Sequence, residues 1–158
     1  MLSNDNIFKT KMYLKNYSKY KIMIDNLTDE IKEIKQKLDY EPTAPVARYN
    51  DNIASTNKEL TSVEAVTAQR ESYILEIKQL EYRLNSIAMI IRKIDRAMTG
   101  LTKIDKNIIV KYYLEEYTWR EIAQQYCYSL SWIKKRAIQA IKQLSDMIFG
   151  IDVDILLI

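Results

Sequence analysis

Two runs of apolar residues, spaced alternately by four and three positions, dominate the first hundred residues. On an α-helix this spacing gathers the apolar side chains into one narrow stripe. The first stripe consists of Tyr13, Tyr17, Tyr20, Ile24, Leu27, Ile31, Ile34 and Leu38. The second consists of Val63, Val66, Arg70, Tyr73, Ile77, Leu80, Leu84, Ile87, Ile91, Ile94 and Met98. Neither helix can bury its own stripe, so we expect an antiparallel, coiled-coil-like hairpin over residues 1–100.

The segments around these stripes carry weaker patterns. Residues 1 to about 10 are mostly polar, and we expect them to be frayed. Both prolines fall within residues 41–51, which predicts a loop there, whereas residues 52–60 fit no single pattern. Gly100 suits the position just after a helix C-terminus. A domain boundary is therefore expected near residues 99–103.

The last third of the chain predicts three shorter helices, over about 103–115, from Thr118 onward, and from Ser129 to about Ile148. Thr118 and Glu121 have the spacing of a capping box, and Ser129 is a favourable N-cap. Only about three residues separate the second and third helices, and Ala123 is small enough for a close crossing. This predicts a helix-turn-helix within residues 101–158. The third helix is expected to bury Ile133, Ala137, Ala140, Ile141 and Leu144.

The third predicted helix carries the chemistry of a DNA-reading surface. Between Ser129 and Ser145 it has four basic residues and no acid. Lysine and arginine can neutralise phosphates, and serine, glutamine and arginine can bond base edges. The residues expected to contact DNA are Ser129, Ser131, Trp132, Lys134, Lys135, Arg136 and Gln139. Trp132 fits either a groove contact or packing back on the hairpin, whereas Trp119 is expected to pack internally.

The composition favours an all-α fold and argues against catalysis. Only two glycines and two prolines occur among 158 residues, too few for the many turns of a strand-rich fold. The chain has no histidine and one cysteine, Cys127, so we expect no metal site, no cofactor and no enzymatic activity. A single cysteine, no signal-peptide pattern and no long apolar run predict a cytoplasmic protein without a membrane span. The net charge of +3 neither requires nor excludes nucleic acid.

The stretch from Thr118 to Leu144 resembles region 4 of bacterial sigma factors. The family pattern is Thr or Ser, two residues, Glu-Ile-Ala, a short turn, Ser, and a recognition helix. The residues in register are Glu121, Ile122, Ala123, Ser129, Ile133, Arg136, Ala140 and Leu144. The resemblance implies that Ser131, Trp132 and Lys134 to Arg136 face DNA. The layout of the whole chain resembles phage and prophage late-transcription regulators of the ArpU and RinA types.

Two positions depart from the region 4 pattern. The family usually has glycine in the turn where this chain has Cys127, so we expect a turn of different shape here. The family often has arginine where this chain has Gln139, which removes one phosphate contact.

Three functions remain open from the sequence. The first is a sequence-specific transcription regulator, which the resemblance extends to an activator of phage genes that contacts RNA polymerase. The second is a DNA-packaging subunit that forms a large ring. The third is a protein-interaction module without DNA binding. The hairpin fits both an intramolecular pair and association between copies of the chain. The apolar tail from residue 150 fits packing on the hairpin or on another subunit.

Overall fold

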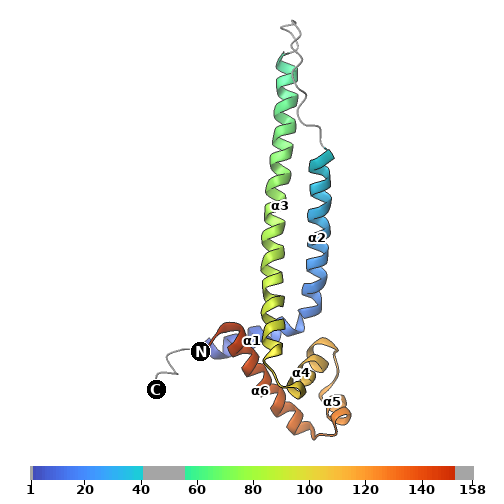
Figure 1. Ribbon diagram of the computed structural model, residues 1–158, viewed down its shortest axis with the longest axis vertical. Coiled ribbons are helices and arrows are strands. Elements are labelled where there is room, and N and C mark those ends of the chain that lie inside the picture. The colour runs from blue at the N-terminus through green and yellow to red at the C-terminus, as the bar shows by residue number, and fades with distance from the viewer. Residues whose placement is uncertain (1, 41–55, 152–158) are drawn as a thin grey trace. The chain divides into compact units, whose positions relative to one another are not determined.

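The computed structural model describes residues 2–40 and 56–151, and within these ranges all regular structure is helical (Figure 1). The elements are α1 (Leu2–Lys15), α2 (Tyr17–Tyr40), α3 (Thr56–Thr99), α4 (Lys103–Ile109), the π-helical turn η1 (Val110–Leu114), α5 (Trp119–Tyr126) and α6 (Leu130–Phe149). The all-α prediction is therefore confirmed. The predicted loop over 41–51 and most of the apolar tail lie outside the described residues. In the described part of the chain, no helix has the length and apolar character needed to cross a membrane.

The chain divides into two compact units, of which one is Met23–Ser86 and the other combines Met1–Ile22 with Ile87–Ile158. These bounds differ from the predicted boundary near residue 100, because the start of the chain and the end of α3 group with the C-terminal helices. The roles assigned to the two parts of the chain stay predictions: assembly or partner docking for residues 1–100, and DNA binding for residues 101–158.

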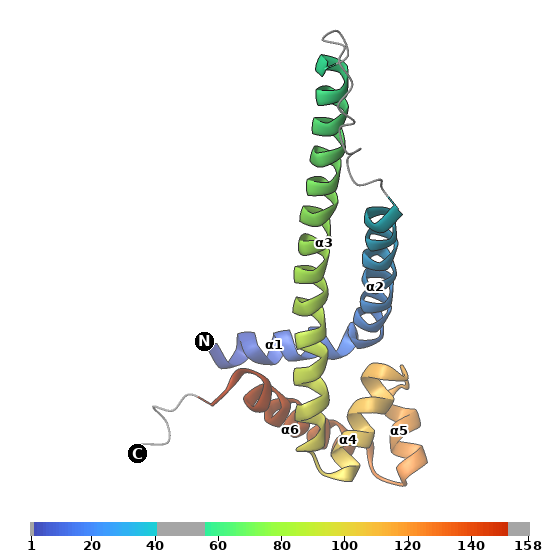
Figure 2. The ribbon, with the colours of Figure 1, turned by 45° about the horizontal axis from the view of Figure 1, so that its top comes forward.

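The unit Met23–Ser86 contains the predicted antiparallel hairpin, in which α2 and α3 lie side by side (Figure 2). Its buried side chains are Leu27, Ile31, Ile34, Ile77 and Leu80, all members of the two predicted stripes. Arg70, the one polar residue of its stripe, donates from Nη1 to the carbonyl of Leu38, 2.9 Å away. It thereby satisfies a carbonyl in the last turn of α2, which has no partner in its own helix.

The structure corrects the expectation that the first ten residues are frayed. Residues 2–10 belong to α1, in which Thr10 and Leu14 are fully buried. The Thr10 hydroxyl donates to the carbonyl of Asn6 at 2.8 Å, so its burial leaves no hydroxyl unsatisfied. Tyr13 stacks on Phe149 of α6 with ring centroids 5.9 Å apart. Helix α1 is thus part of the C-terminal unit's core.

The first predicted stripe also does not form one uninterrupted helix. The break lies at Asn16, between α1 and α2. The Asn16 side chain donates from Nδ2 to the carbonyl of Met12 at 2.9 Å. Such local side-chain bonds offer the backbone an alternative to the regular helix ladder. Tyr13 consequently packs with the C-terminal unit instead of with the hairpin.

Helix α6 takes part in both hydrophobic clusters of the C-terminal unit. The first cluster joins the C-terminal half of α6 to α1, the end of α3 and Ile109. The second joins Ile133 and Ala137 of α6 to Ile108, Ile122 and Ala123. All five residues predicted for the buried face of this helix are buried.

Gly100 ends α3 as predicted, and the structure adds a second reason for glycine there. A Cβ atom on Gly100 would lie only 2.5 Å from the sulfur of Met147. The end of α3 and helix α6 can therefore approach each other closely at this point.

We predict that Leu14→Ala destabilises the protein by about 2 to 5 kcal/mol, because it opens a cavity beneath α1. Phe8→Ala is the matched control, since Phe8 lies on the same helix and is 62% exposed. Urea unfolding of both variants measures the difference. Equal, small effects of the two changes would contradict the packing of α1.

Candidate nucleic-acid interface

Helix α5 begins with the predicted capping box. The hydroxyl of Thr118 accepts from the backbone N–H of Glu121 at 3.3 Å, and the Glu121 carboxylate accepts from the N–H of Thr118 at 2.7 Å. These bonds satisfy two backbone donors that a helix start otherwise leaves open. The hydrogen bond from the Thr118 N–H, followed by that from its hydroxyl, lowers the pKa of Glu121. The carboxylate therefore stays ionised in its capping role at neutral pH.

The turn between α5 and α6 has a left-handed residue at Cys127, with φ of 55° and ψ of 36°. The N–H of Tyr128 bonds the carbonyl of Ala123 at 3.1 Å, which closes α5. The expectation of a differently shaped turn is wrong in this respect, because Cys127 adopts the conformation that glycine most readily supplies. Ala123 is buried in the cluster shared with α6, as a close crossing of the two helices requires.

Ser129 serves as the N-cap of α6. Its hydroxyl accepts a hydrogen bond from the N–H of Trp132 at 3.2 Å. This confirms the predicted cap. It also means that the hydroxyl expected to contact DNA already has a structural partner at the helix start.

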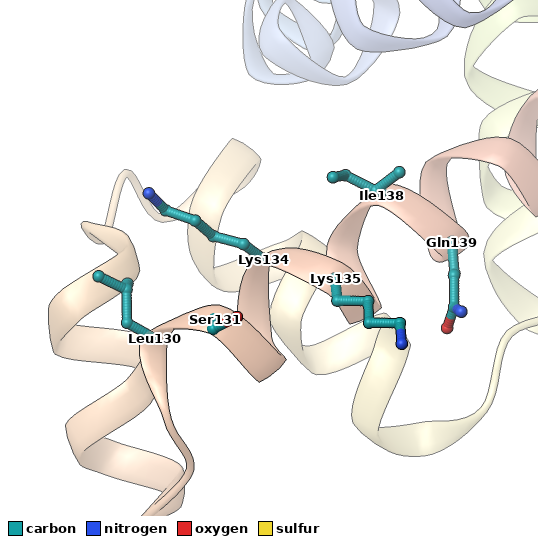
Figure 3. A pocket seen from close by; sticks show the side chains of 6 residues that line it. All are labelled: Leu130, Ser131, Lys134, Lys135, Ile138 and Gln139. Carbon is teal, nitrogen blue, oxygen red and sulfur yellow. The ribbon is translucent and has the colours of Figure 1, made fainter.

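One face of α6 collects exposed and half-buried side chains around an open hollow (Figure 3). We call this set the α6 face; its members are Leu130, Ser131, Lys134, Lys135, Ile138 and Gln139. The spacing i, i+1, i+4, i+5, i+8 and i+9 places them on one side of the helix. Four of the seven residues predicted to contact DNA are thus brought together. The structure adds Ile138, which is 71% exposed, whereas Leu130 at the start of the helix already stood out in the sequence as a leading apolar residue.

The α6 face is positively charged and lacks internal neutralisation. Lys134 and Lys135 are exposed and form no ion pair within the described residues. No acidic residue lies on α6 before Asp146. Two free ammonium groups beside hydroxyl, amide and apolar side chains provide both phosphate-binding and base-reading chemistry.

Trp132 lies off this face. Its ring stacks on Tyr128, with centroids 4.0 Å apart and planes 18° from parallel. The ring also packs against the cluster that contains Ile133 and lies 5.6 Å from the guanidinium carbon of Arg136. Trp132 thus packs within the helix-turn-helix itself, and not on the hairpin as the second of the two expected roles required.

Arg136 also points away from the α6 face. Its Nε and Nη2 donate to the two carboxylate oxygens of Asp105, at 2.8 Å and 2.7 Å. Asp105 is only 4% exposed, so the bidentate arginine neutralises a charge inside the unit. The same carboxylate accepts from the hydroxyl of Thr102, the N-cap of α4. This placement argues against a DNA contact by Arg136 and assigns it to holding α4 against α6.

The helix expected over 103–115 forms as α4 followed by η1. Trp119 stacks on Tyr112, with centroids 3.6 Å apart, which bears out its predicted internal packing. Burial raises the pKa of the neighbouring Tyr113 to about 12, so its phenol is neutral. These aromatic contacts hold the start of α5 against η1.

Residues 97–146 match the sequence family described as Sigma-70, region 4. The match covers about a third of the chain, from the end of α3 into the last turn of α6. It includes the helix-turn-helix and the whole α6 face, whereas α1 and α2 lie outside it. No curated protein and no solved structure matches the chain.

We predict that Arg136→Ala destabilises the protein by about 2 to 4 kcal/mol, because it leaves the buried Asp105 carboxylate without its counter-ion. Lys135→Ala, one residue away and exposed, is expected to change stability by no more than about 0.5 kcal/mol. Thermal and urea unfolding of the two variants make the comparison. If the Lys135 variant were as unstable as the Arg136 variant, this would contradict a structural role for the ion pair.

Proposed function

We propose that this chain is a sequence-specific, DNA-binding transcription regulator whose α6 face enters the major groove of double-stranded DNA. The match of residues 97–146 to Sigma-70, region 4 is the premise. The observation that carries the proposal is the α6 face itself, a solvent-exposed surface with two unpaired lysines on the helix that follows the turn. In helix-turn-helix proteins this second helix lies in the major groove with its N-terminal residues contacting the bases.

The side chains of the α6 face suit the edges of bases in that groove. Gln139 can bond adenine through its N6 and N7 atoms, and Ser131 can bond several base edges. Leu130 and Ile138 supply apolar contacts for thymine methyl groups. Lys134 and Lys135 reach phosphates or guanine edges, and their binding to phosphates releases counter-ions. The face thus combines attraction to any duplex with preference among sequences.

Ser129, Trp132 and Arg136 support this surface without belonging to it. Ser129 caps α6, Trp132 covers the turn, and Arg136 ties α6 to α4. They orient the helix that carries the proposed contacts. Substitutions at these positions are expected to lower the stability of the fold more than they change the preference for particular bases.

The proposal extends to partners beyond DNA. A contact with bacterial RNA polymerase and a phage or prophage origin rest on the resemblance of residues 118–144 to sigma factors and phage regulators. We further propose association of copies through the unit Met23–Ser86. The exposed apolar side chains Ile74, Leu75 and Tyr82 support that role, because they lie on a helix without a partner on that side in the described residues.

The decisive test is the salt dependence of DNA binding, measured by fluorescence anisotropy on pooled genomic fragments of the source. We predict that Lys134→Gln with Lys135→Gln lowers affinity about tenfold or more and reduces the slope of log affinity against log salt by about two. Gln is an uncharged polar residue with a helix preference similar to that of Lys, and both positions are exposed, so folding should be unchanged.

The matched control is Lys32→Gln with Lys37→Gln, which makes the same charge change at two exposed lysines of α2 that form no ion pair within the described residues. Its affinity should stay close to that of the original chain. Failure of the original chain to bind any fragment at low salt would overturn the proposal and leave a protein-interaction module. An equal loss of affinity in both double variants would mean that net charge alone accounts for the effect.

A further inference from the structure

Helix α1 lies outside the matched residues 97–146 and yet packs against α6 and η1. Its buried side chains Thr10 and Leu14, and the stack of Tyr13 on Phe149, hold it against the C-terminal unit. The described side chains on its outer surface are therefore held at defined places beside the helix-turn-helix.

Two lysines of α1 border the helix-turn-helix directly. Lys11 lines a hollow together with Lys134, Ile138 and Lys142 of α6. Lys11 and Lys15 line a second hollow with Thr118 and Trp119, at the start of α5. Lys134 and Ile138 also belong to the α6 face, so the first hollow continues the proposed DNA-binding surface toward α1. In Figure 3 these two side chains leave α6 on the flank opposite to Lys135 and Gln139.

The charges along this border are mostly uncompensated. Lys11, Lys15, Lys134 and Lys142 are exposed, and within the described ranges none of them forms an ion pair. Lys9 differs, because its Nζ lies 2.7 Å from a carboxylate oxygen of Asp5. No acid is among the described residues that line the first hollow, and Glu116 is the one acid that lines the second. Glu121 lies close by in sequence, and its ionised carboxylate accepts hydrogen bonds from Thr118 and pairs with no lysine in the described part of the chain.

We propose that α1 is a second DNA-contacting element, in which Lys11 and Lys15 bind phosphates beside the groove that α6 occupies. The inference rests on the proposed function and extends its binding surface. In helix-turn-helix complexes the helix before the recognition helix crosses the DNA backbone, and helix N-termini are common phosphate contacts. Thr118 marks that end of α5, and Lys11 and Lys15 border it. In this arrangement Lys11 and Lys15 lie beside the path of the phosphates of one DNA strand.

DNA fits this border better than an acidic protein does. The lysines of α1 adjoin Lys134 and Lys142 in one series that runs from α6 to the start of α5, as a phosphate backbone requires. The added contacts are to phosphates and not to bases. They are expected to strengthen binding to all sequences to a similar extent.

The test is the full-length double variant Lys11→Gln with Lys15→Gln in the same anisotropy measurement. Loss of two phosphate contacts should reduce the salt slope by about two and weaken binding to preferred and random duplexes by the same factor. The preference between the two duplexes should stay as it is. The Lys32 and Lys37 double variant again controls for net charge.

The outcomes separate this inference from the proposed function. No DNA binding by the original chain defeats both. Binding that is weakened by the Lys134 and Lys135 double variant, but not by the Lys11 and Lys15 variant, overturns the inference about α1 alone. In that case the lysines of α1 are open to an acidic protein surface.

A second readout needs no substitution. Bound DNA should protect Lys11 and Lys15 from chemical acetylation, as measured by peptide mass spectrometry, while Lys32 and Lys37 keep their reactivity. Acetylation of Lys11 and Lys15 at an unchanged rate in the complex would also overturn the inference.

Discussion

The burial of α6 along two hydrophobic clusters is the constraint on which the rest of the C-terminal unit depends. Ile133 and Ala137 belong to the cluster with α4 and α5, and Ala140, Ile141 and Leu144 belong to the cluster with α1 and the end of α3. Because these positions recur at helical spacing, both clusters lie against one side of the helix. The opposite side must then face solvent, and it carries the lysines and polar groups of the α6 face.

Polar contacts inside the C-terminal unit fix the orientation of α6 more precisely than apolar burial does. The bidentate contact between Arg136 and Asp105 joins α6 to α4, and Thr102 shares the same carboxylate. The capping box at Thr118 and the cap at Ser129 set where α5 and α6 begin. A hydrogen-bonded ion pair tolerates little displacement, so these contacts keep the α6 face at a constant angle to the turn. A reading surface for base edges needs that precision.

Local patterns in the sequence were sufficient for the pairing of α2 with α3, the caps, the position of the turn and the buried side of α6, but not for the shape of the turn. Each depends on residues within one or two helical turns, such as Thr118 with Glu121, or on regular spacing within one helix. The role of Arg136 could not be predicted in the same way, because its partner lies 31 residues away. The one available signal was Asp105, an acid among the apolar positions of its helix. Without that partner, Arg136 resembled the exposed lysines beside it.

The packing of α1 against the C-terminal unit could not be predicted for a different reason. Its buried side includes Thr10, a polar residue whose hydroxyl is satisfied within its own helix, so the apolar spacing of Ile7 and Leu14 seemed incomplete. The regular stripe from Tyr13 onward also concealed the break at Asn16. Of the seven residues predicted to contact DNA, Ser131, Lys134, Lys135 and Gln139 share the α6 face. Ile138 was missed because an isolated exposed isoleucine carries no distinctive pattern.

The central claim is that the α6 face reads the major groove, and methylation interference on a preferred duplex tests it most directly. Guanine N7 lies in the major groove and adenine N3 in the minor groove. We predict that methylation of specific guanine N7 atoms blocks binding, while methylation of adenine N3 within the same site is tolerated. Interference confined to adenine N3, or none at either atom on a duplex that is bound preferentially, would contradict the account.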